Sequence, residues 1–205
     1  MNELSLFTGA GGGVLGTHHL LGWKTCGYVE WNEYCQRVIA ARIADGYLTN
    51  APIFTDVREF VQSGAAEQYR GIADVVTAGF PCTPWSSAGR QLGGEDANNM
   101  WPATRDVIRL VSPPSVLLEN VPRLISSGYI GTVLGDLASL GYMGRWGILS
   151  AKNTGPSLHL RERVWICAHT NSSQRKRRRI SFGVQPEYAN SSNHSWWKVE
   201  PAVDR

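Results

Sequence analysis

Short apolar runs of strand length alternate with helical patterns along residues 1–169, and this alternation restricts the possible folds more than any other feature. Most runs are rich in Val, Ile, Leu or aromatic residues and are bounded by Gly, Pro or Asp, as β-strands commonly are. The predicted strands are Leu4–Phe7, Thr25–Val29, Asp74–Ala78, Ser115–Leu118, Gly144–Leu149 and Val164–Ala168. Apolar residues at helical spacing predict the helices Asn32–Ala44, Pro102–Val111 and Tyr129–Leu140.

This order of strands and helices predicts an α/β fold with a mostly parallel sheet flanked by helices. In open sheets of this class, ligands bind beyond the carboxyl ends of the strands. The residues that directly follow each apolar run are therefore the candidate site.

The charge is divided unevenly, which predicts a boundary near His169. Residues 170–205 hold 7 Lys and Arg against 3 Asp and Glu, a net charge of +4, whereas residues 1–169 hold 13 against 14, a net charge of −1. We predict a folded domain over residues 1–169 and a basic tail, rich in Ser and Asn, over residues 170–205. The basic run of the tail could contact phosphates, or the tail could be disordered and solvated.

Composition excludes several classes of protein. The hydrophobic content of 42% and the net charge of +3 do not fit intrinsic disorder. No window approaches the roughly 18 consecutive apolar residues of a membrane span, and the N-terminus lacks a secretory pattern, so we expect a cytoplasmic protein without a membrane partner. The cysteines show no paired spacing typical of zinc sites, so no metal is expected. Cys26, Cys35 and Cys167 lie in apolar contexts and are predicted to be core residues.

The ends of the first strands carry residues suited to a nucleoside. A glycine-rich turn, Phe7–Gly13, follows the first run and would allow close approach of the backbone to a ligand, although a flexible turn is an equal interpretation. Glu30 follows about 20 residues later, a spacing at which an acidic residue can bind ribose hydroxyls. Trp31 could stack on adenine. Asp56-Val57 follows the third segment, in another place suitable for a nucleoside contact. A solvated Glu30 at a helix start is the alternative.

The ends of the later strands carry residues suited to covalent and acid–base chemistry. Cys82 lies in a loop bracketed by prolines, where an exposed thiol could act as a nucleophile, although a lone cysteine is more often inert. Glu119 follows a strongly apolar run, so a partly buried carboxyl suited to proton donation is expected, unless Asn120 simply caps a helix. Arg161 and Arg163 would share one face of a strand and could clamp an anion, or form an ordinary edge-strand charge pair.

Taken together, these segments resemble the cytosine-C5 DNA methyltransferases of phage and bacterial type, which depend on S-adenosylmethionine. The matching segments occur in the family's order and cover about residues 3–168. They are Phe7–Gly12, Glu30-Trp31, Asp56-Val57, Gly79–Cys82, Glu119–Val121 and Arg161–Arg163. The resemblance implies the Rossmann-like fold of S-adenosylmethionine-dependent methyltransferases and double-stranded DNA as the partner.

The resemblance also implies roles for individual residues. Cys82 would be the nucleophile, Glu119 would bind and protonate the base, Arg163 would clamp base or carboxylate, and Arg161 would lie near phosphate. Glu30 would bind the ribose of the cofactor and Asp56 would lie near the adenine amine. The implied cofactor contacts in full are Phe7, Gly9, Gly11, Glu30, Trp31, Asp56, Val57, Pro81 and Trp101. The implied nucleic-acid contacts are Ser86, Ser87, Arg90, Arg175 and Arg177.

The sequence departs from the family pattern at its end. Family members continue into a target-recognition region, of which the basic tail at 170–205 could be the start in a reduced form. They then have a Gly-Asn segment with a following Pro, and no such segment is found here. We therefore expect the C-terminal elements to be missing, and with them part of the cofactor pocket. This leaves two alternatives to an active DNA methyltransferase. One is an impaired fragment or split-enzyme half that binds nucleic acid, with a complementing C-terminal chain; the other is an RNA cytosine-C5 methyltransferase.

Overall fold

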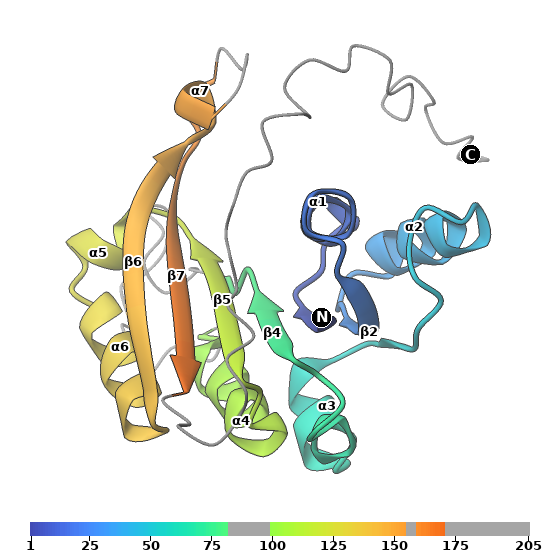
Figure 1. Cartoon of the computed structure of the whole chain (residues 1–205), viewed down its shortest axis with the longest axis horizontal. Helices are drawn as coiled ribbons and strands as arrows, with labels where there is room; N and C mark the ends of the chain where they lie inside the picture. Colours follow the sequence, from blue (N-terminus) through green and yellow to red (C-terminus); the bar gives the residue numbers. More distant parts are fainter. Residues whose placement is uncertain (82–98, 155–158, 171–205) are drawn as a thin grey trace. The chain divides into compact units, whose positions relative to one another are not determined.

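Seven strands form one sheet in the order β3-β2-β1-β4-β5-β7-β6 (Figure 1). The computed structural model describes residues 1–81, 99–154 and 159–170. The strands are β1 (Asn2–Leu6), β2 (Lys24–Val29), β3 (Ile53–Phe54), β4 (Val75–Ala78), β5 (Ser115–Asn120), β6 (Tyr142–Ser150) and β7 (Glu162–Thr170). Every neighbouring pair is parallel except the two that involve β7. The predicted mostly parallel sheet is therefore confirmed.

Helices connect the strands and cover the sheet. They are α1 (Gly12–Leu21), α2 (Glu33–Ala44), α3 (Val57–Gln62), α4 (Trp101–Val111), α5 (Arg123–Ser126), α6 (Ile130–Ser139) and α7 (Ala151–Thr154), with a 3-10 turn η1 (Ala66–Tyr69). The three predicted helices are confirmed to within one residue at each end. The helix α2 begins as expected, because the Asn32 side chain accepts a hydrogen bond from the Cys35 backbone N–H at 3.1 Å.

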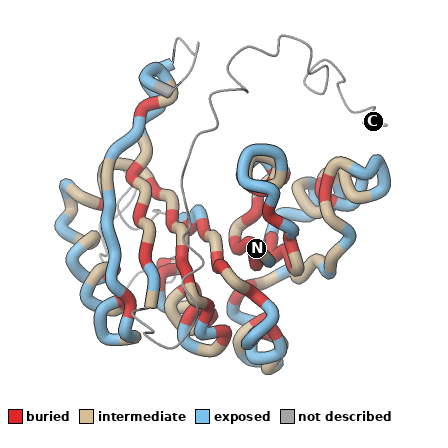
Figure 2. The backbone as a smooth tube through the Cα atoms, in the orientation of Figure 1, coloured by how far each residue is buried: buried red, intermediate tan, exposed pale blue. Residues whose placement is uncertain are grey.

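The alternation of side chains along the strands divides the apolar residues between two clusters. The larger cluster joins β1, β4, β5 and β7 to α3, α4 and α6, and includes Leu4, Val76, Leu118, Ile108 and Val133. The smaller one packs α1 and α2 against β2 through Val14, Tyr28, Ile39 and Leu48. Figure 2 shows the buried residues along the central strands. The parallel strands thus present their carboxyl ends at one edge of the sheet.

The three described cysteines are only half-buried, so the prediction that they are core residues is wrong. Side chains in a strand alternate between its two faces, so an apolar run does not bury all of its members. Cys26, for example, packs at the border of the larger cluster, and its thiol donates to the Glu3 carbonyl at 3.2 Å. Burial still raises the pKa of the Cys26 thiol to about 11, which keeps it protonated at neutral pH.

Candidate functional site

Glu30 joins the ends of β1 and β2. Its carboxylate accepts a hydrogen bond from the Gly9 backbone N–H at 2.6 Å and another from the Asn32 backbone N–H at 2.8 Å. The Gln36 side chain donates to the Glu30 carbonyl at 2.7 Å. Because Glu30 is also buried, the alternative of a solvated glutamate at a helix start is wrong. The carboxylate is held in one place by the two segments it connects.

The glycine-rich turn after β1 has a defined shape. Phe7, Gly9 and Gly11 all have positive φ angles, of 53°, 59° and 90°. At Gly11 a Cβ atom would lie 3.2 Å from the Leu48 side chain, so both the backbone angle and the available space favour glycine. The bond from Gly9 to Glu30 fixes the middle of the turn. The structure therefore favours an ordered turn over the flexible turn that the sequence left open.

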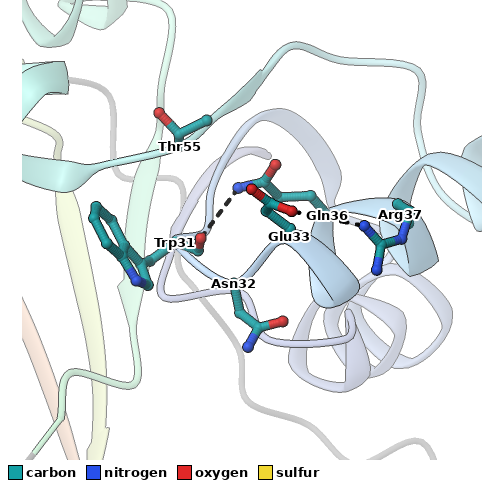
Figure 3. Close-up of a pocket in the computed structure, with 6 residues that line it drawn as sticks. All are labelled: Trp31, Asn32, Glu33, Gln36, Arg37 and Thr55. Atoms are coloured by element: carbon teal, nitrogen blue, oxygen red, sulfur yellow. Dashed lines mark hydrogen bonds and ion pairs between the residues drawn. The ribbon is translucent and has the colours of Figure 1, made fainter.

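An open pocket of about 600 Å³ is formed by residues that follow β2 and β3. It is lined by Trp31, Asn32, Glu33, Gln36, Arg37 and Thr55 (Figure 3). The Trp31 side chain is 73% exposed, while its carbonyl accepts a hydrogen bond from Gln36 at 3.3 Å. An accessible indole held by its backbone can stack on a flat ligand. The sequence patterns did not point to Gln36 or Thr55, although Gln36 lies one helical turn after Asn32.

Asp56 and Val57 have structural roles beside the pocket. The Asp56 carboxylate caps α3, accepting a hydrogen bond from the Arg58 backbone N–H at 2.6 Å. The Val57 side chain is buried in the larger apolar cluster, so a ligand would meet its backbone rather than its side chain. Thr55, one residue earlier, lines the pocket. The structure brings this segment to the pocket, but it does not show the predicted ligand contacts of Asp56 and Val57.

A second group of predicted residues meets at the carboxyl ends of β4 and β5. The Arg163 Nε atom forms an ion pair with Glu119 Oε1 at 2.7 Å, with the two side chains 22% and 31% exposed. The other Glu119 oxygen lies over Gly79, where a Cβ atom would approach it to 3.2 Å. Glu119 is therefore partly buried, as predicted. One of its carboxylate oxygens pairs with Arg163, and the other lies near the backbone of Gly79.

Asn120 connects β5 to the turn that follows β4. Its Nδ2 atom donates to the Phe80 carbonyl at 3.0 Å, and its Oδ1 atom accepts from the Val121 backbone N–H at 2.8 Å. The alternative in which Asn120 caps a helix is wrong, because α5 begins after Pro122 without a side-chain cap. Pro81 is exposed at the end of this turn. Cys82, Ser86, Ser87, Arg90, Arg175 and Arg177 lie outside the described residues.

The sequence suggested that Arg161 and Arg163 lie on one face of a strand, and this prediction is wrong. The pairing of β6 with β7 ends at Ser150 and Glu162, so Arg161 precedes the strand. Arg161 is exposed and lines a separate pocket of about 510 Å³ with Ala151, His159 and Leu160. Of these two arginines, Arg163 is the one that pairs with Glu119.

Trp101 lies in the core rather than at an open surface. Its side chain is 1% exposed, its indole N–H donates to Asp136 at 2.8 Å, and its ring packs against Phe80 at a centroid distance of 5.3 Å. The predicted cofactor contact is therefore not supported for Trp101. The buried Trp101 ring instead helps to pack α4 against the sheet.

Neither a metal-binding cluster nor a membrane-spanning helix is found in the described ranges. No group of three or more His, Cys, Asp and Glu side chains there could hold a metal ion. Within the same ranges, no helix has both the length and the apolar character needed to cross a bilayer.

Comparison with known proteins gives concordant matches. The model of the family "C-5 cytosine-specific DNA methylase" matches residues 1–200. The type II methyltransferase M.NgoMIV of Neisseria gonorrhoeae is 31% identical over 173 residues, which cover 82% of this chain and 52% of that protein. The type II methyltransferase M.CviJI of Paramecium bursaria Chlorella virus IL3A is 33% identical over 168 residues, or 80% of this chain and 41% of that protein. The chain thus spans about half the length of these curated relatives.

Solved structures with the same fold include the DNMT2 of Spodoptera frugiperda. The TM-score is 0.65 and the sequence identity is 17%, over 88% of this chain and 53% of that one. At this identity the match concerns the fold.

Proposed function

Because the chain belongs to the C-5 cytosine-specific DNA methylase family, we propose that it transfers a methyl group from S-adenosylmethionine to carbon 5 of cytosine in double-stranded DNA. The observation that carries the proposal is the ion pair of Glu119 and Arg163 beside Gly79, at the end of the strand that leads to Pro81 and Cys82. A carboxyl and a guanidinium are the groups needed to hold a cytosine ring next to a thiol.

The residues at the ends of β1 and β2 fit a nucleoside cofactor. The Glu30 carboxylate is fixed by two backbone N–H groups, and each carboxylate oxygen can accept a further hydrogen bond, as ribose hydroxyls require. The exposed Trp31 ring beside an open pocket suits adenine. Phe7, Gly9 and Gly11 shape the adjoining turn. We assign S-adenosylmethionine to these residues, with the backbone of Asp56 and Val57 at the adenine edge and Pro81 toward the reacting end.

The chemistry requires a nucleophile, because carbon 5 of cytosine is unreactive. In our proposal the Cys82 thiolate adds to carbon 6, which makes carbon 5 nucleophilic. The bound cofactor would supply the methyl group that carbon 5 takes, and S-adenosylhomocysteine would be the leaving group. Loss of the carbon-5 proton to solvent, departure of the thiolate and return of the ring-nitrogen-3 proton to Glu119 then restore the neutral aromatic base.

Glu119 and Arg163 act on the base in this scheme. Charge that develops toward ring nitrogen 3 is stabilised by the Glu119 carboxyl, which donates a proton to it. Arg163 orients that carboxyl through the 2.7 Å contact.

Because carbon 6 is inaccessible in a stacked duplex, the cytosine must leave the helix before the thiolate can reach it. We assign Arg161, Ser86, Ser87, Arg90, Arg175 and Arg177 to phosphate contacts.

Covalent trapping tests the proposal directly. The full chain is incubated with S-adenosylmethionine and a long mixed-sequence duplex in which 5-fluorocytosine replaces cytosine. In this base fluorine takes the place of the carbon-5 proton and cannot leave as a cation, so the thiolate is not eliminated and the enzyme should remain attached to the DNA. Cys82→Ser should abolish the adduct, whereas Cys35→Ser, at a half-buried cysteine on α2, should preserve it. No adduct and no transfer of labelled methyl by the unchanged chain would contradict independent activity.

The alternative functions make different predictions in the same assays. A chain that binds nucleic acid without transferring methyl groups would form no adduct, and calorimetry would find weak or no binding of S-adenosylmethionine. An RNA methyltransferase would transfer methyl groups to tRNA in preference to duplex DNA in a competition assay. The type II methyltransferases among the relatives favour DNA.

A further inference from the structure

Asn120 is buried and uses both ends of its amide. The side chain is 4% exposed. Its NH₂ group donates to the Phe80 carbonyl at 3.0 Å, while its oxygen accepts from the Val121 backbone N–H at 2.8 Å. An amide placed in this way links two backbone segments, one after β4 and one after β5. Its loss would leave a buried carbonyl without that partner.

The Phe80 ring is held by a different element, α4. It packs against Trp101 at a centroid distance of 5.3 Å. Trp101 is itself fixed, because its indole donates to Asp136 at 2.8 Å and its backbone N–H donates to the Asn99 side chain at 3.1 Å. The carbonyl of Phe80 is therefore held by β5 and its ring by α4.

The backbone beside Phe80 lies close to the Glu119 carboxylate. A Cβ atom at Gly79 would be 3.2 Å from Glu119 Oε2, so the absence of a side chain there lets the turn and that oxygen lie near each other. Asn120 directly follows Glu119 in β5, so the residue that contributes the carboxylate is adjacent to the one that fixes the turn. The distance between the turn and the carboxylate depends on this pair of neighbours.

We propose that Asn120 is a positioning residue that sets the distance between the Gly79–Pro81 turn and the Glu119 carboxylate. The proposal rests on the methyl-transfer function proposed above, because Cys82 follows Pro81 in the chain. A displacement of about 1 Å at a reacting group can lower the rate roughly a hundredfold. Loss of the Asn120 bonds should therefore slow the chemical step and leave cofactor binding at Glu30 and Trp31 intact.

The test compares Asn120→Ala with a matched control. Tyr142→Phe removes another buried hydrogen bond from a side chain to a backbone carbonyl, that of Tyr142 to Pro113 at 2.7 Å, far from the carboxyl ends of the strands. With unmethylated genomic DNA, we expect Asn120→Ala to lower kcat about tenfold to a hundredfold, with KM for S-adenosylmethionine changed less than about twofold. Tyr142→Phe should leave both constants within about twofold. Equal effects of the two variants, or an unchanged kcat in Asn120→Ala, would overturn the proposal.

A second variant covers the case in which Asn120→Ala does not fold. Asn120→Asp keeps the acceptor for Val121 but loses the donor to Phe80 while it is ionised. When protonated, its carboxyl can donate to the Phe80 carbonyl, so its activity relative to the unchanged chain should rise as the pH is lowered. A constant ratio across pH would contradict the positioning role.

Hydrogen exchange separates this proposal from the proposed function. Backbone exchange at Phe80 and Val121 should be faster in Asn120→Ala than in Tyr142→Phe, whether or not the chain transfers methyl groups. If the unchanged chain is inactive but exchange follows this pattern, the proposed function fails and the structural linkage stands. If exchange at Phe80 and Val121 is unaffected, the positioning proposal fails.

Discussion

At the scale of single residues, the two carboxylates of the site were found from the places they occupy after strands. Glu30 follows β2 and Glu119 lies at the end of β5. Their partners could not be predicted in the same way. Gly9 is 21 residues from Glu30, and Arg163 belongs to the antiparallel strand that pairs with β5. A local pattern indicates which residue is available for chemistry, but hydrogen-bond partners depend on which segments the fold brings together.

One buried carboxyl has no signal in the sequence. Glu3 is 1% exposed in β1, where it accepts hydrogen bonds from Thr17 at 2.5 Å and from Thr77 at 2.7 Å. Burial raises its pKa above the ordinary value of 4.5, although the two hydroxyl groups oppose that shift. The folded state therefore keeps this proton at pH values where the unfolded chain has lost it.

This difference predicts a pH dependence of stability. The contribution of Glu3 is greatest below the ordinary pKa of 4.5 and is lost as the pH rises through the raised pKa of the folded state. Glu3→Gln stays uncharged, so its free energy of unfolding should fall less than that of the unchanged chain between about pH 4.5 and about pH 8. Urea titrations at both pH values measure the difference, with the exposed Glu67→Gln as control. Identical losses in all three proteins would refute the role of Glu3.

At the scale of elements, glycine explains why the helix α1 was not predicted from the sequence. The helix α1 contains Gly12, Gly13 and Gly16, and glycine is a poor helix former, so the segment was interpreted only as a turn. Packing of Val14 against Tyr28 and Ile39 stabilises the helix instead. The strand β3 was not assigned for a different reason: it has two residues, which is too short for an alternating pattern.

In α1 glycine disfavours the helix, whereas in β2 a glycine is required by the packing around it. At Gly27 a Cβ atom would lie 2.6 Å from the Tyr69 hydroxyl and 3.0 Å from the Leu4 side chain. Gly27→Ala should therefore lower the free energy of unfolding by about 1–3 kcal/mol, and Tyr69→Phe should restore part of the loss. At Gly16, which has open space around it, alanine should raise the free energy of unfolding by about 0.5–1 kcal/mol. Chemical denaturation compares the variants. Equal effects at the two positions would contradict the packing around Gly27.

At the scale of the whole molecule, the described residues all fall within one compact unit, Met1–Ser172. The predicted division near His169 and the basic tail that follows it stay predictions, since residues 171–205 lie outside the described ranges. The sequence nevertheless concentrates positive charge there, with five consecutive basic residues at positions 175–179. Such a run would contribute to nucleic-acid affinity without reading the base sequence.

Removal of residues 173–205 tests this division. We expect the shortened chain to keep the thermal unfolding midpoint of the full chain, because the compact unit is retained. Its affinity for duplex DNA should depend less on salt, by about one unit of slope for each phosphate that the basic run no longer neutralises. Replacement of the five basic residues by serine in the full chain should have the same effect on the slope. An unchanged salt dependence in both proteins would exclude phosphate contacts by the run.

The sequence by itself determined the fold class, the six longer strands, three helices and the family, because these depend on local periodicity and on short motifs in a fixed order. Only the tertiary structure decided that Glu119 pairs with Arg163 and not with Arg161, that Trp101 is buried, and that Asn120 holds the turn after β4. These outcomes depend on strand order and register, which bring together residues far apart along the chain. Local patterns do not encode such proximities, since they arise only when the strands pair.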